Sequence, residues 1–205
     1  MKRKQSAQML CVSALLSAIS IIIPIIMPFK IVIPPASFTL ASHVPIFLAM
    51  MICPTVAITV AIGATVGFFI GGFPIVIVLR AGSHLVFALL GALYLKKNRA
   101  ILDTVLPLRV FSLLIGLLHA VCEVFVVAAF YFGGDMAQAY YQSGFMHSVL
   151  LLVGLGTVIH SMVDFEIAQF AVKMLCKQKA IESLFLQKQK NFEKKTLNAT
   201  NGKSL

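Results

Sequence analysis

Two strongly apolar segments carry ionisable side chains spaced four residues apart. Arg80 and His84 lie in one segment, and His119 and Glu123 lie in the other. A spacing of four places both members of a pair on the same face of a helix. A guanidinium stays charged, so within an apolar segment it requires an acidic partner, a polar cavity or an anionic ligand. This pattern is suited to binding a small anion, most simply a carboxylate held by two parallel hydrogen bonds from Arg80.

An Arg80–Glu123 ion pair that only joins two helices is the main alternative. A lone buried pair of this kind rarely improves stability over apolar packing. The two histidines and the hydroxyl of Ser83 beside the pair therefore favour a ligand site. We expect Glu123 to accept a hydrogen bond from the ligand or to hold the guanidinium in position, with His84 and His119 as neutral donors.

Further ligand contacts are expected from two loops. Residues 29–42 are apolar but contain a Pro-Pro pair and several hydroxyls, which is typical of a segment packed over a cavity rather than of a helix. The last loop and the start of the final helix add tyrosine and histidine side chains at the mouth of the cavity. The contacts predicted from these loops are Phe38, Thr39, Tyr140 and His147.

Composition limits the class of protein that can carry this site. The chain has 205 residues, of which 60% are hydrophobic and 12% are charged, and its mean hydropathy is +0.96. These values exclude an ordinary soluble domain. At about 20 residues per spanning helix, the length leaves no space for a separate catalytic domain.

The apolar segments predict an all-α, polytopic membrane protein with six transmembrane helices in one bundle, and four spans are the alternative. Lysines and arginines accumulate on one side of the expected helices, which indicates cytoplasmic N- and C-termini. We expect a transmembrane domain over residues 1–176 and a basic cytoplasmic tail over 177–205, which could contact anionic lipids. Nucleic-acid binding is not needed to explain the net charge of +10. The expected spans are 7–27, 43–52, 55–70, 75–95, 108–132 and 145–172.

Small residues predict where helices approach one another closely. Gly63, Gly67 and Gly71 share one face of the third expected helix, and serines and alanines form a similar stripe on the first. His160 and Asp164 share a face of the sixth expected helix, in its cytoplasmic half. We interpret this pair as a helix–helix clamp, for example with Arg109, and keep a proton relay as the alternative. The spacing of histidines, cysteines and acids predicts no metal site.

Taken together, these features resemble the substrate-binding S components of energy-coupling factor (ECF) transporters. The resemblance rests on the basic start, the Ala14-xxx-Ala18 pattern, the proline-bearing loop after the first span, the short second span and the Gly-Gly-Phe-Pro turn. It implies a prokaryotic plasma-membrane protein that captures a small water-soluble vitamin. Within the family the chain is most similar to niacin-type members, and pantothenate is the second candidate substrate.

The resemblance also implies partners. Ala14 and Ala18 would face a transmembrane T component, and two cytoplasmic subunits would bind and use ATP, so this chain itself carries no cofactor. The substrate cavity would open outward beneath the loop of residues 29–42.

Two other classes of protein remain as alternatives. A proton-coupled secondary transporter of a small organic anion would use Glu123, His160 and Asp164 as a relay, but the sequence shows no convincing internal repeat of the kind such transporters usually have. An intramembrane enzyme would need a nucleophile or metal motif, and none of the familiar ones is present. We therefore expect a protein that is not an enzyme.

Overall fold

The computed structural model describes residues 2–33, 36–178 and 185. The chain divides into two compact units, Met1–Gln169 and Phe170–Leu205. All the residues that form the site described below belong to the first unit. The predicted basic tail lies outside the described residues, apart from 177, 178 and 185.

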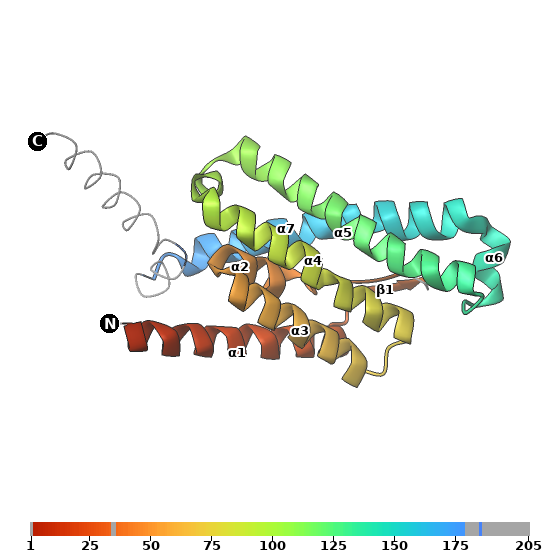
Figure 1. Cartoon of the computed structure of the whole chain (residues 1–205), viewed down its shortest axis with the longest axis horizontal. Coiled ribbons are helices and arrows are strands. Elements are labelled where there is room, and N and C mark those ends of the chain that lie inside the picture. Colours follow the sequence, from red (N-terminus) through yellow and green to blue (C-terminus); the bar gives the residue numbers. More distant parts are fainter. Residues whose placement is uncertain (1, 34–35, 179–184, 186–205) are drawn as a thin grey trace, which may run out of the picture. The chain divides into compact units, whose positions relative to one another are not determined.

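The described residues are mainly helical, as the sequence predicted (Figure 1). Four helical segments are long and apolar enough to cross a membrane: Ala7–Ile26, Ile75–Lys97, Val105–Gly133 and Gln138–Leu175. A mainly helical membrane protein is therefore confirmed. The helices are α1 (Lys2–Ile26), α2 (Val44–Ile52), α3 (Pro54–Ile70), α4 (Ile75–Lys97), α5 (Val105–Gly133), α6 (Gln138–Phe145) and α7 (Gly156–Leu175), with a short 3-10 helix η1 (Arg99–Asp103) and a π-helical segment η2 (Met146–Leu155).

The expected second span is a short buried helix. At 1.5 Å per residue, the nine residues of α2 extend only about 14 Å, which is less than half of a bilayer core of about 30 Å. All residues from Pro45 to Ile52 are buried, because α2 is apolar on every side. Arg99 donates hydrogen bonds to the carbonyls of Met51 and Ile52 and so satisfies the end of the helix. Six spans with cytoplasmic termini stay a prediction.

The segment predicted as an irregular loop contains a β-hairpin. Strands β1 (Lys30–Ile33) and β2 (Ala36–Thr39) pair antiparallel, with Lys30 opposite Thr39 and Ile33 opposite Ala36. The β-branched run Ile-Val-Ile in β1 favours this conformation. The prediction of an exclusively α-helical chain was therefore incomplete, although the segment does lie over a cavity.

Helices α1 and α3 pack closely through small residues. A Cβ atom on Gly67 would lie 2.6 Å from the Cα of Ile21, and one on Gly63 would lie 3.0 Å from the Cβ of Ser17. Ser20 strengthens the contact, because its hydroxyl lies 3.3 Å from the carbonyl oxygen of Val60. The predicted close packing of this glycine face is confirmed for Gly63 and Gly67.

Substituting Gly67→Ala is expected to destabilise the protein by about 1–3 kcal/mol, because a methyl group would overlap backbone atoms of α1 that cannot rotate away. The measurement is thermal unfolding of the detergent-purified protein. Gly82→Ala is the matched control, since its Cβ would meet only Thr65 at an ordinary 3.8 Å. Equal unfolding temperatures for the two variants would contradict a tight α1–α3 contact.

Candidate functional site

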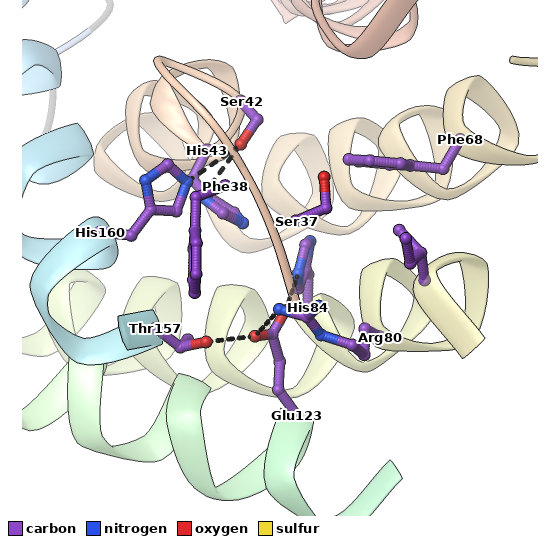
Figure 2. A pocket seen from close by; sticks show the side chains of 11 residues that line it. Ser37, Phe38, Ser42, His43, Phe68, Arg80, His84, Glu123, Thr157 and His160 are labelled. Carbon is purple, nitrogen blue, oxygen red and sulfur yellow. Dashed lines mark hydrogen bonds and ion pairs between the residues drawn. The ribbon is translucent and has the colours of Figure 1, made fainter. Parts of the chain in front are cut away.

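A small pocket lies where α2, α3, α4, α5, α7 and the β-hairpin meet (Figure 2). Its volume of about 20 Å³ is close to the space that one water molecule needs. The wall includes a buried ion pair, three histidines and several aromatic or hydroxyl side chains. The lining residues are Ser37, Phe38, Ser42, His43, Phe68, Ile77, Arg80, His84, Glu123, Thr157 and His160.

Glu123 on α5 is the electrostatic centre of this wall. Its Oε2 atom accepts hydrogen bonds from Arg80 Nη2 at 2.7 Å and from Thr157 Oγ1 at 2.5 Å. Its Oε1 atom lies 3.2 Å from His84 Nε2 and 3.4 Å from His119 Nε2. The two predicted helical pairs therefore meet, and Glu123 holds the guanidinium in position. The Arg80–Glu123 ion pair considered as an alternative does form, but it borders a pocket instead of only joining helices.

Four of the five histidines gather beside Glu123. The ring of His43 lies at their centre, with centroid distances of 4.7 Å to His84, 4.7 Å to His119 and 5.0 Å to His160. His43 occupies this position because it immediately precedes α2, which begins inside the protein. Sequence reasoning missed His43 and Thr157, although a histidine directly before a wholly apolar helix was an available signal for the former.

Asp164 on α7 fixes the chain between the hairpin and α2. Its carboxylate accepts hydrogen bonds from the backbone N–H of Ala41 at 2.8 Å and of His43 at 2.9 Å, and it lies 3.0 Å from His43 Nδ1. Ala41 has a φ of 64°, a left-handed conformation that costs about 1–2 kcal/mol for a residue with a side chain. The carboxylate helps to hold this strained turn and thereby the end of the hairpin.

The predicted clamp between Arg109 and the His160–Asp164 pair was wrong. Arg109 forms its ion pair with Glu166, and both side chains are substantially exposed. Asp164 instead faces inward and is fully buried, because it shares an inner face of α7 with Thr157 and His160. His160 consequently lines the same pocket as Arg80 rather than a separate cytoplasmic site.

The side chain of Phe38 packs the hairpin against α7. Its ring packs edge-on to His160, with centroids 5.5 Å apart (Figure 2). The ring also fills a notch at the start of α7. The notch exists because residue 156 is glycine. A Cβ atom at this position would lie 2.6 Å from Phe38 Cζ. The hairpin strand β2 therefore covers the pocket with its side chains Ser37 and Phe38.

The sequence is 40% identical over 166 residues to the niacin transporter NiaX of Lactococcus lactis subsp. cremoris, and the match covers 81% of this chain and 73% of that protein. The chain belongs to the niacin-type S components of ECF transporters. The resemblance seen in the sequence is therefore confirmed. The transporter relative also favours transport over catalysis. No family model matches the chain, and no solved structure matches it.

Some predicted ligand contacts of this S component lie away from the pocket. Ser83 donates its hydroxyl to the carbonyl of Arg80 at 2.7 Å, as hydroxyls in helices often do. Thr39 is buried at the end of β2 and does not line the pocket. His147 is exposed at the start of η2, and Tyr140 lies in α6, also outside the pocket wall.

The predicted partner-facing alanines of the S component are accessible. Ala14 and Ala18 are exposed on α1, while Ser13, Leu16 and Ser20 of the same helix are buried. The helix thus uses one side for packing and leaves the alanine side open. Large apolar side chains such as Leu15 and Ile22 flank the alanines and are also exposed.

Proposed function

We propose that this S component captures nicotinate, the anionic form of niacin, at the pocket beside Arg80. The observation that carries the proposal is an arginine side chain only 4% exposed at the wall of a pocket, in a chain 40% identical to a niacin transporter. A guanidinium has five N–H donors in a planar fork, so it can hold Glu123 on one side and a ligand carboxylate on another. Pantothenate, which also carries a carboxylate, is the second candidate.

Binding requires the pocket to enlarge. A pyridine ring with its carboxylate is several times larger than a cavity of about 20 Å³. The hairpin side chains Ser37 and Phe38 are the movable part of the wall, because the remaining lining residues lie on or directly before helices. Displacement of Phe38 would admit the ring, and an aromatic neighbour such as Phe68 could then pack against it.

The captured substrate would then be delivered through an ECF module. The S component would present its exposed Ala14 and Ala18 to a T component, and two ATP-binding subunits would supply the energy. In this arrangement the chain spans a prokaryotic plasma membrane with six helical segments and cytoplasmic termini. It needs no cofactor of its own, because ATP is used by the partner subunits.

The binding test compares nicotinate with nicotinamide, which has the same ring but a neutral amide. Titration calorimetry on the purified protein should show nicotinate binding at least about tenfold more tightly, because only the carboxylate forms a charge-assisted bidentate contact with Arg80. Pantothenate is titrated in parallel. Equal affinity for nicotinate and nicotinamide would refute the assignment of Arg80.

Proton-coupled secondary transport is the second candidate, because buried acids and histidines lie together at Glu123 and Asp164. Uptake of labelled nicotinate by cells that contain the complete ECF module separates the two. We expect uptake to survive collapse of the proton gradient and to stop when ATP is depleted. The reverse result would support the secondary transporter.

The double substitution Ala14→Trp/Ala18→Trp is expected to abolish uptake while leaving nicotinate affinity unchanged. Both positions are exposed and do not line the pocket, and two large rings would prevent close approach of a partner helix. Co-purification with the T component and uptake are measured together. Leu114→Trp, on an exposed face of α5, is the control and should retain both. Wild-type uptake by the double variant would exclude this surface as the interface.

A further inference from the structure

We propose that His43, His84 and His119 form a binding site for a divalent transition-metal ion such as Zn²⁺, Co²⁺ or Ni²⁺. One ring nitrogen from each of the three lies within 4.8 Å of the others. The residues come from the start of α2, from α4 and from α5, so three separate elements converge on one point. Neutral imidazole is a preferred ligand of these ions.

The three rings are buried, so any ring nitrogen without a hydrogen-bond partner is also out of reach of water. His43, His84 and His119 are 6%, 3% and 0% exposed. Among the described residues, His84 Nδ1 and both ring nitrogens of His119 have no hydrogen-bond partner. A buried polar nitrogen without a partner destabilises the folded protein. Coordination of a metal ion would satisfy one nitrogen on each ring.

Carboxylates contact the second ring nitrogen of His43 and of His84, as they often do in metal sites. Asp164 Oδ2 lies 3.0 Å from His43 Nδ1, which leaves Nε2 of that ring for a metal. Glu123 Oε1 lies 3.2 Å from His84 Nε2, which leaves Nδ1. A ligating histidine usually donates its other N–H to such a carboxylate, which fixes the tautomer and the orientation of the ring.

The distances are suited to a site that closes slightly on binding. Tetrahedral Zn²⁺ with nitrogen ligands at about 2.0–2.1 Å needs nitrogens about 3.3 Å apart. Small rotations of the rings would bring them from within 4.8 Å to that separation. Three protein ligands leave one position open, and His43 and His84 border the pocket, so that position can face it (Figure 2).

A second set of three groups, His43, His160 and Asp164, shares the central histidine. In this set the Asp164 carboxylate already accepts backbone hydrogen bonds from Ala41 and His43 at 2.8 and 2.9 Å. A metal ion would have to compete with those bonds, and the strained turn at Ala41 depends on them. The three-histidine set does not use the carboxylate that holds this turn, and it is therefore the site we assign.

The test uses the purified full-length protein without a polyhistidine tag, stripped with a chelator and then titrated with Co²⁺ and, separately, with Zn²⁺. No nicotinate is present, so the result is independent of the proposed function. We expect one ion per chain after dialysis, and visible absorption bands of nitrogen-coordinated Co²⁺. A wild-type protein that retains neither ion overturns the proposal without any variant.

Variants then locate the site. His119→Gln and His84→Gln are expected to weaken Co²⁺ binding at least about tenfold, and size-exclusion chromatography checks that they remain folded. His147→Ala is the matched control, because that histidine is exposed and outside the cluster, and it should bind as the wild type does. His160→Ala should also retain the ion. Loss of binding in His160→Ala with retention in His119→Gln would overturn the assignment.

Discussion

Arg80→Ala is expected to weaken nicotinate binding by about 30-fold to several thousand-fold, which corresponds to about 2–5 kcal/mol. The guanidinium is buried at the pocket wall, so its contact with a ligand carboxylate would be shielded from water and correspondingly strong. Titration calorimetry with nicotinate measures the loss. Unchanged affinity would place the ligand carboxylate elsewhere.

The controls for this substitution separate binding from folding. Arg80→Ala alone leaves Glu123 buried without its cation, which destabilises a protein by about 3–5 kcal/mol when such a pair is broken. The double variant Arg80→Ala/Glu123→Gln removes both charges and should unfold at a higher temperature than Arg80→Ala. It should nevertheless fail to bind nicotinate. Arg80→Lys keeps the charge but loses the planar fork, and intermediate affinity is expected.

Asp164→Ala is expected to weaken nicotinate binding about 10- to 100-fold by releasing the hairpin and His43 together. The carboxylate holds two backbone N–H groups and one imidazole, and hydrogen bonds to a charged group contribute about 1.5–3 kcal/mol each. Without them the strained turn at Ala41 would relax, and the side chains Ser37 and Phe38 would lose their position over the pocket. Calorimetry measures the affinity, and proteolysis within the hairpin measures its release.

Glu166→Gln is the matched control for Asp164→Ala. It also removes a carboxylate from α7, but that side chain is 37% exposed, pairs with the half-exposed Arg109 and accepts a hydrogen bond from Gln169 at 3.5 Å. Exposed ion pairs contribute at most about 1 kcal/mol, so affinity and proteolysis should stay near those of the wild type. If both variants weakened binding equally, the anchoring role of Asp164 would be wrong.

Helical periodicity was sufficient to predict which side chains of α4 and α5 share a helix face. Arg80 with His84, and His119 with Glu123, could each be assigned to one helix face, and a permanent charge among apolar residues required a partner. The structure brings these pairs together around Glu123. The glycine face of α3 was predictable for the same reason, because a spacing of four determines which residues meet a neighbouring helix.

The missed residues depend on features that periodicity does not encode. His43 reaches the site because α2 is too short to cross a membrane and begins inside the protein. His160 and Asp164 were predicted to lie in the cytoplasmic half, away from the pocket, because a regular α-helix was expected over 145–172. The structure has α6, then the π-helical η2, and only then α7, so positions along this segment do not advance at the regular rate. Thr157 follows the same irregular segment.

The close packing of Phe38 against Gly156 affects the rate of ligand binding. If the Phe38 ring must move out of this contact before a vitamin can enter, the rate of binding is limited by how often the ring moves. Stopped-flow traces would then show an association rate that rises with nicotinate concentration and levels off at the opening frequency. A larger side chain at residue 156 would prevent the Phe38 ring from packing there and would raise the limiting association rate.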